Sequence, residues 1–287
     1  MPELPEVAAL VDDLTARLSG RAITRVDVVA ISALKTFDPP PTALVGLLVD
    51  GVSRHGKFLD IDASGVHLVV HLARAGWLRW RDSLPDDPPK PGRGPLALRV
   101  GLDDQTGFDI TEAGTRKRLA IYVVHNPSDV PGIVRLGPDP LAEDFTPESL
   151  QRILTAAGRA QLKGVLRDQS LIAGIGNAYS DELLHAAQLS PYKPAANLSG
   201  DEVQRLYAVT RGLLGEAIER ARGLGASELK SEKKSGLRVH GRAGQPCPVC
   251  GDTIREVSFA DSALQYCATC QTAGKPLADR RLSRLLK

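Results

Sequence analysis

The four cysteines of the chain place the strongest constraint on its fold. They are Cys247, Cys250, Cys267 and Cys270, which form two C-x2-C pairs separated by sixteen residues. Two such pairs, each on a tight turn, can direct four thiolates at one tetrahedral Zn²⁺ ion and leave no ligand position for water. A pair of disulfides is the alternative, and it is less compatible with a chain that has no secretory signal. We therefore expect one structural zinc ion as the cofactor, not a catalytic metal.

The residues between the two cysteine pairs predict a β-hairpin that carries the metal. Their apolar side chains have the spacing of strands: Ile254, Val257, Phe259, Leu264 and Tyr266. We expect a zinc-finger hairpin over residues 238–271, followed by a basic C-terminal extension over 272–287. This extension is either a solvated tail or a nonspecific contact with DNA or a protein partner.

Charge is distributed unevenly along the chain. The net charge is only +2, but residues 220–287 hold 13 Lys and Arg against 6 Asp and Glu, which leaves −5 for the first 219 residues. A basic C-terminal end suits a polyanion such as nucleic acid, although a solvated basic surface has the same composition. No run of eighteen apolar residues occurs and no signal peptide is evident, so we expect a cytoplasmic protein without a membrane partner.

The rest of the chain predicts a multidomain α and β protein. Residues 1–125 suggest an N-terminal helix plus a β-sandwich, because short apolar or alternating runs are separated by Gly, Pro and Asp. These runs cover residues 21–30, 57–63, 66–73, 77–82 and 96–102. Residues 126–145 are rich in Pro, Gly and Asp and are typical of a linker. Helical patterns follow at 146–158, 160–170, 177–188 and 200–222, with Thr146 and either Ser199 or Asp201 as caps.

Two short motifs are ambiguous when each is taken alone. The N-terminus reads PELPEV at residues 2–7, where proline and glutamates at the head of an amphipathic helix are typical of an ordinary helix start. The stretch GIGN at 174–177 allows a sharp turn before a helix. Exposed amides there, with the Asn177 side chain, form a phosphate-binding nest, or the turn only caps the helix.

Together the motifs resemble the formamidopyrimidine-DNA glycosylase and endonuclease VIII family of base-excision repair enzymes. The resemblance covers nearly the whole chain, in one order, on a β-sandwich followed by helices and a zinc hairpin. The matching stretches are PELPEV at 2–7, HGKF at 55–58, HLARAG at 71–76, LK at 162–163, GIGNAY at 174–179 and HGRAGQPCPVCG at 240–251. The resemblance implies a helix-two-turns-helix domain over 146–237 and damaged double-stranded DNA as the partner of a monomer.

The resemblance also implies a nucleophile at the N-terminus. After removal of Met1, the secondary amine of Pro2 would attack C1′ of a damaged nucleotide and form a cationic Schiff base. Glu3 would act as general acid and base at the sugar, with Lys57 among the catalytic residues. Glu6 would bind the N-terminal backbone or help to position the amine.

DNA-binding residues are implied by the same matches. Lys57, His71, Lys163 and Asn177 correspond to the donors that hold phosphates around the extrahelical nucleotide. Three features depart from the family pattern. Ser262 occupies the hairpin position of an arginine that grips these phosphates, and Arg255 compensates only if the hairpin brings it forward.

The second departure concerns the wedge that fills the gap left by the extrahelical base. Arg74 stands where the family has methionine, and Lys117 or Arg118 with Leu119 stands for its Arg-Phe pair. The third departure is the segment 223–241, which is short and charged where the purine-specific branch of the family has a longer loop that closes over 8-oxoguanine. It is more similar to the endonuclease VIII branch, whereas PELPEV is similar to the purine branch. The preferred lesion therefore does not follow from these residues.

The favoured interpretation is a bifunctional DNA glycosylase and abasic-site lyase acting on oxidised or ring-opened bases. The alternative is a lesion-binding or abasic-site-binding protein of the same fold with weak or no excision activity. A zinc-ribbon protein unrelated to repair is a third possibility, which PELPEV and GIGN disfavour.

Overall fold

The structure is a computed structural model that describes residues 2–90, 94–259 and 262–278. These residues form two compact units. The first contains residues 2–136 and 218–233, and the second contains 137–217 and 234–278. Each is described by itself below.

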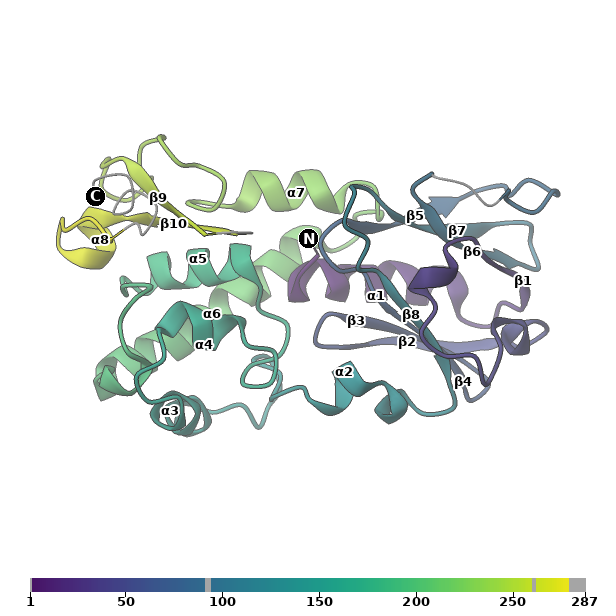
Figure 1. The fold of residues 1–287 in the computed structure, drawn as a ribbon, viewed down its shortest axis with the longest axis horizontal. Coiled ribbons are helices and arrows are strands. Elements are labelled where there is room, and N and C mark those ends of the chain that lie inside the picture. The colour runs from purple at the N-terminus through teal and green to yellow at the C-terminus, as the bar shows by residue number, and fades with distance from the viewer. Residues whose placement is uncertain (1, 91–93, 260–261, 279–287) are drawn as a thin grey trace. The chain divides into compact units, whose positions relative to one another are not determined.

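The first unit is built on two four-stranded antiparallel sheets and a long N-terminal helix, α1 (Leu4–Leu18). One sheet has the strand order β1-β6-β7-β5 and the other has β2-β3-β4-β8. The strands are β1 (Ile23–Val28), β2 (Val49–His55), β3 (Phe58–Ala63), β4 (Val66–His71), β5 (Gly76–Arg81), β6 (Leu96–Leu102), β7 (Gly107–Glu112) and β8 (Ala120–Val124). Helix α1, purple in Figure 1, contacts β2 and β3. The predicted helix and β-sandwich are thus confirmed.

Alternation along the strands explains how the core of the first unit forms. In β3, the side chains of Leu59, Ile61 and Ala63 are buried in the core together with Leu10 and Leu14 of α1. The intervening β3 side chains lie on the opposite face, because successive strand residues point to opposite sides of a sheet. Two short 3-10 helices, η1 (Ile31–Ala33) and η2 (Pro41–Leu44), connect β1 to β2.

Residues 126–145 contain more structure than an extended linker. A 3-10 helix, η3 (Pro127–Asp129), and a short helix, α2 (Pro131–Val134), lie at the start of this segment. Val130, between them, packs with Phe58 and Val69 on the outer face of the second sheet. The approach at Gly132 is so close that a Cβ atom there would lie 2.4 Å from the Phe58 ring.

The second unit is mainly helical. Its helices are α3 (Pro147–Ala156), α4 (Leu162–Arg167), α5 (Asn177–Ala186), the 3-10 helix η4 (Ala195–Asn197) and α6 (Gly200–Ala221), whose last turn belongs to the first unit. Thr146 caps α3 by accepting the Ser149 N–H. Ser199 caps α6 through reciprocal bonds with Glu202, so Ser199, not Asp201, fills this role.

Helix α7 (Leu229–Gly236) is a feature that the sequence analysis did not predict. It lies in the segment interpreted as a charged loop, since three lysines in eight residues obscure its single apolar anchor, Leu229. Leu229 is buried in the core of the first unit beside Ala226. The helix therefore forms through tertiary packing, not through a visible amphipathic pattern.

The cysteine-rich segment forms the predicted hairpin. Strands β9 (Ile254–Ser258) and β10 (Ala263–Cys267) pair antiparallel, and a short helix, α8 (Ala268–Thr272), follows. The Phe259 N–H donates to the carbonyl of Ser262 across the hairpin loop. Most of the basic residues of the predicted extension 272–287 lie outside the described residues. None of the described helices is long and apolar enough to cross a membrane.

Gly137 permits a close backbone approach that a side chain would block. Its N–H donates to the carbonyl of Gln169, and a Cβ atom would lie 2.6 Å from the carbonyl group of Leu171.

We expect Gly137→Ala to lower the free energy of unfolding by about 1–3 kcal/mol. The added Cβ atom would clash with the Leu171 backbone, which cannot move aside as a flexible side chain can. Gly164→Ala in α4, where a Cβ atom meets nothing within 4 Å, is the matched control and should be neutral or slightly stabilising. Denaturant unfolding of both variants measures this, and equal stabilities would contradict the close approach.

Candidate active site and nucleic-acid interface

The N-terminus carries two buried carboxylates at the first turn of α1. Glu3 is the N-cap and Glu6 is the third helical residue, and they form a capping box in which the Glu3 N–H donates to Glu6 Oε2 at 2.7 Å. Glu3 is 2% exposed and Glu6 is 3% exposed. PELPEV therefore forms a helix start. The Glu6 side chain also makes the expected contact with the N-terminal backbone, at the N–H of Glu3. Pro2, directly before the cap, is also buried.

Lys233 of α7 is the cation beside these carboxylates. Its Nζ lies 2.6 Å from Glu6 Oε2 and 3.6 Å from Glu3 Oε1. Burial raises the pKa of Glu6 above its ordinary value, the Lys233 ammonium opposes this, and the Glu3 carboxylate adds to it. The sequence analysis missed Lys233, although its spacing of four residues from Leu229 puts both on one helix face.

Lys57 and His71 lie together near one end of the second sheet. Lys57 is buried in the turn between β2 and β3, and His71 ends β4, where its ring contacts that of Phe58 with centroids 4.7 Å apart. Burial, with the nearby Lys57 ammonium, lowers the pKa of His71 to about 4. At neutral pH His71 is therefore an uncharged hydrogen-bonding group, and any positive charge offered here belongs to Lys57.

Asp60 ties neighbouring strands of this sheet together. His55 Nε2 lies 3.0 Å from Asp60 Oδ2, and His67 Nδ1 lies 2.9 Å from Oδ1. Burial alone would raise the pKa of Asp60, but the hydrogen bonds to the two histidines bring it below its ordinary value. The contact braces the β2–β3 turn that carries Lys57.

The residues predicted to form a wedge lie in two turns of the sandwich. Arg74 is exposed in the turn after β4, next to Ala73 with its positive φ of 51°. Lys117 and Arg118 are exposed before β8, where Lys117 Nζ donates to the Glu112 carbonyl. Leu119 is different: it is 2% exposed and packs in the sandwich core, so the expectation that it contributes to the wedge is wrong.

Buried Glu112 shapes the second of these turns. Its Oε1 accepts the N–H groups of Arg118 and Leu119, at 2.7 and 3.0 Å. A carboxylate that accepts backbone N–H groups orders the chain around it. The backbone of the turn that carries Lys117 and Arg118 is thus held in place by Glu112.

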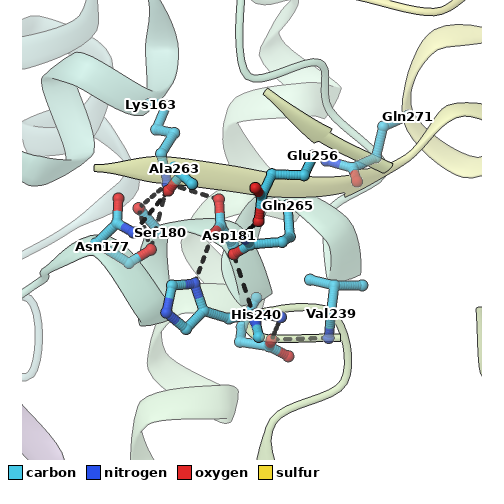
Figure 2. A network of polar contacts seen from close by, with 12 residues as sticks. Lys163, Asn177, Ser180, Asp181, Val239, His240, Glu256, Ala263, Gln265 and Gln271 are labelled. Carbon is cyan, nitrogen blue, oxygen red and sulfur yellow. Dashed lines mark hydrogen bonds and ion pairs between the residues drawn. The ribbon is translucent and has the colours of Figure 1, made fainter. Parts of the chain in front are cut away.

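A glutamine closes the loop that carries the GIGN motif. Gln169 Oε1 accepts the N–H of Gly174, which has a φ of 90°, and Nε2 donates to the carbonyl of Ile175. Asn177 then begins α5, and its Nδ2 donates to the Ala263 carbonyl at 2.8 Å. Figure 2 shows this contact with the first residue of β10. Asn177 thereby links the loop to the zinc hairpin.

Lys163 lies at the centre of a buried polar network (Figure 2). Its Nζ donates to the Asn177 carbonyl, to Ser180 Oγ at 2.8 Å and to Asp181 Oδ1 at 2.5 Å. Asp181 also contacts His240 Nδ1 at 2.7 Å. These contacts of Lys163 are with α5, and its predicted contact with phosphate stays a prediction.

Glu182 anchors the chain that enters the zinc hairpin. Its carboxylate accepts three successive backbone N–H groups, those of Arg238, Val239 and His240, at 2.8–2.9 Å. Burial raises the pKa of Glu182, and these hydrogen bonds oppose the rise. The sequence analysis missed this residue, because nothing in its spacing reveals a partner 56 residues away.

The four cysteines converge as a zinc site requires. Their sulfur atoms all lie within 4.8 Å of one another, with Cys247 and Cys270 at 3.9 Å and Cys250 and Cys267 at 3.3 Å. A tetrahedral site with Zn–S bonds of about 2.3 Å has sulfur atoms about 3.8 Å apart, so the donor set fits Zn²⁺. His185 of α5, also missed by the sequence analysis, has Nε2 3.2 Å from Cys247 Sγ. It orients a metal ligand from the helical part of the unit.

Ser262 lies in the hairpin loop directly before β10. Arg255 lies on β9 opposite Tyr266, whereas Ser258 is opposite Ala263 beside the loop. Three strand residues span about 10 Å, so Arg255 lies at the metal end of the hairpin. Among the described residues, Arg255 is therefore not brought forward to replace an arginine at position 262.

Comparison with known proteins covers all three parts of the chain. Residues 1–119 match the formamidopyrimidine-DNA glycosylase N-terminal domain, 136–228 match its H2TH domain, and 244–273 match a zinc finger found in FPG and IleRS. A formamidopyrimidine-DNA glycosylase of Symbiobacterium thermophilum is 36% identical over 98% of this chain and 93% of that protein. The chain belongs to the formamidopyrimidine-DNA glycosylase family.

Other members of the glycosylase family support this assignment. An uncharacterized formamidopyrimidine-DNA glycosylase-like protein of Mycobacterium tuberculosis is 57% identical over 53% of this chain and 94% of that protein. The crystal structure of the Thermus thermophilus MutM (Fpg) protein matches with a TM-score of 0.80 and 30% identity, over 96% of this chain and all of that one. Lactococcus lactis Fpg bound to DNA containing an abasic site matches with a TM-score of 0.82 and 26% identity, over 94% and 99%. The predicted family, the helix-two-turns-helix domain and the zinc finger are thus confirmed.

Removal of zinc should affect structure locally. We expect Cys267→Ser to lose the metal, unfold the hairpin and weaken duplex DNA binding by at least about tenfold, or about 1.4 kcal/mol. Val249→Ser, a change at a 61% exposed side chain in the same turn, is the control. Metal analysis, DNA titration and thermal unfolding test this. Retained duplex affinity after complete metal loss would contradict a structural role for zinc.

Proposed function

We propose that this protein is a bifunctional DNA glycosylase and abasic-site lyase that uses Pro2 as its nucleophile. The observation that carries the proposal is the buried carboxylate pair next to Pro2, with Glu3 immediately after the proposed amine. Membership in the formamidopyrimidine-DNA glycosylase family and likeness to a relative bound to abasic-site DNA support damaged DNA as the substrate.

The first step joins the amine to the sugar. The lone pair of the Pro2 nitrogen attacks C1′ and the bond from C1′ to the base breaks, so the base leaves with the electrons of that bond. The departing base takes up the proton that the Pro2 nitrogen loses, which restores the lone pair on the nitrogen. The nitrogen then expels the ring oxygen from C1′, and Glu3 in its acid form protonates that oxygen. The product is a ring-opened, cationic Schiff base.

The second step cleaves the strand. The iminium makes the protons on C2′ acidic, so a carboxylate can remove one, and the electrons expel the phosphate at C3′. Glu3, left as a carboxylate by the first step, is the proposed base. An α-amine has an ordinary pKa of about 8, so a useful fraction of Pro2 would be neutral near physiological pH.

Cationic and polar residues support the DNA-binding part of the proposal. We assign phosphate contacts to Lys57, His71, Lys163 and Asn177. Lys57 adds charge beside a neutral His71, while Lys163 orders the start of α5. Arg74 with Lys117 or Arg118 is assigned to the gap left by the extrahelical base, because these side chains are exposed on turns. Extruding a nucleotide costs a few kcal/mol, which such contacts offset.

Blocking the amine tests the nucleophile. We expect a protein that retains Met1 to lose at least about 99% of borohydride-trapped complex with abasic-site DNA, because its proline nitrogen is an amide. Pro2→Gly, which leaves a primary amine, separates the need for an amine from the need for proline. Circular dichroism and duplex affinity serve as controls for folding. Undiminished trapping by the Met1-retaining protein would remove Pro2 from the mechanism.

A second candidate function is lesion or abasic-site binding with weak excision. Ser262 supplies no charge at its position in the hairpin loop, and Arg255 lies about 10 Å further along the hairpin. The loss of one charged phosphate contact would weaken the hold on an extrahelical nucleotide by roughly 1.5–3 kcal/mol. The loss should matter most for an intact base that must leave its stack.

Restoring an arginine separates these two functions. We expect the wild type to cleave abasic DNA faster than it excises 8-oxoguanine, and Ser262→Arg to raise the excision rate by roughly tenfold or more. Ser262→Gln, a long uncharged side chain, is the control for size. Single-turnover rates on both substrates decide between the outcomes. Turnover of neither substrate by either protein would favour the binding function, and equal changes on both would show that position 262 does not face the lesion.

A further inference from the structure

We propose that Lys233 of α7 is a positioning residue for the N-terminal catalytic group, the counter-ion that holds Glu6 as a carboxylate in its capping box with Glu3. This proposal rests on the proposed function, because it concerns the same carboxylates. It adds a residue to the site from a helix that lies more than 220 positions along the chain.

Two donors share one oxygen of the Glu6 carboxylate, so that oxygen must act as a hydrogen-bond acceptor for both. One oxygen of Glu6, Oε2, accepts both the Glu3 N–H at 2.7 Å and the Lys233 ammonium at 2.6 Å. An ionised carboxylate accepts two such bonds at once, whereas protonation would turn it into a donor and compete with them. Lys233 thus favours the charge state in which Glu6 holds the backbone of Glu3.

Lys233 is delivered to this place by its own helix. Leu229, one turn earlier on the same face of α7, is buried in the core of the first unit. Glu232 pairs with Arg220 near the end of α6 at 3.0 Å, which ties the two helices together. The side chain of Lys233 is only 11% exposed, while the neighbouring Lys230 and Lys234 are exposed. Its location is therefore set by packing and not only by attraction between charges.

The charge balance explains why a counter-ion is needed. Two carboxylates buried three residues apart repel each other, and desolvation also favours their protonated forms. The strongest electrostatic influences on Glu6 come from Lys233 on α7 and from Glu3 at the head of α1. The amides at the start of α1 also favour negative charge there. An opposite charge at ion-pair distance lowers the pKa of a carboxyl group, so loss of Lys233 raises the pKa of Glu6 further.

The pH profile of abasic-site cleavage tests the catalytic part of this proposal. We expect Lys233→Met to move the acidic limb of the single-turnover profile upward by about one pH unit or more, with partial recovery of the rate at high pH. Lys233→Arg should keep a wild-type limb. Lys234→Met, which removes an equal charge from an exposed neighbour, is the matched control and should leave the profile unchanged. Unshifted limbs in all variants would overturn the proposal.

Stability provides a readout that does not depend on turnover. Since the folded pKa of Glu6 lies above its unfolded value, ionising Glu6 reduces stability as the pH rises above about 4.5. Without Lys233 this loss grows, so the melting temperatures of the wild type and Lys233→Met should differ little at pH 4.5 and diverge towards pH 7.5. In the Glu6→Gln background the same substitution should cost less at pH 7.5.

The two experiments separate failure of this proposal from failure of the proposed function. A pH-independent loss of stability, equal in the Glu6→Gln background, would overturn Lys233 as the counter-ion even if the enzyme cleaves abasic DNA. A wild type that cleaves no abasic DNA would contradict the proposed function and the catalytic part of this proposal, while the stability cycle would still decide the role of the ion pair.

Discussion

Burial of two carboxylates at the first turn of α1 is the constraint on which the proposed active site depends. Glu3 and Glu6 are almost completely inaccessible to water, and each would be unstable as an anion without compensation. The helix N-terminus, the capping box and the Lys233 ammonium provide that compensation together. The N-terminal residues are consequently held by groups from both ends of the first unit's sequence. A chain end that would ordinarily fray is thereby fixed well enough to serve as a chemical group.

The second unit also contains buried charged residues, and their charges are compensated by contacts with other polar groups. Three buried charged side chains lie in or beside α5: Lys163 of α4, and Asp181 and Glu182 in the middle of α5. They bond to α5 or to the segment that enters the hairpin. His185 continues this line to the sulfur of Cys247. Such a network favours one arrangement of its side chains, because a buried polar group that loses its hydrogen-bond partner costs free energy. The zinc hairpin is therefore attached to α5 through specific polar contacts.

Much of this organisation is predictable from the sequence, and the reasons for the exceptions are physical. The zinc ligands, the capped helices and five of the strands follow from local spacing, and the structure contains them. Three strands of the sandwich, β2, β7 and β8, were missed. In β2 and β7, polar residues interrupt the apolar pattern; Asp109 of β7, for example, is buried only because Arg99 and Arg81 bind it. Strand β8 directly follows the residues that were interpreted as part of the wedge. Helix α7 and the role of Lys233 were missed because a charged segment with one apolar anchor has little local signal. Leu119 was misplaced because the order of the motifs does not show that its side chain packs in the sandwich core.

We propose that the N-terminal amine, and no lysine side chain, forms the bond to DNA. Lys57 and Lys233 are the relevant competitors within the first unit, because each carries a primary amine and the latter lies 3.6 Å from a Glu3 oxygen. The most direct measurement is to reduce the complex with abasic-site DNA by borohydride, digest it, and locate the added sugar by peptide mass spectrometry. With Pro2 as the nucleophile, we expect a single modified peptide that begins with Pro2. Modification on a peptide containing Lys57 or Lys233, with an unmodified N-terminal peptide, would contradict it.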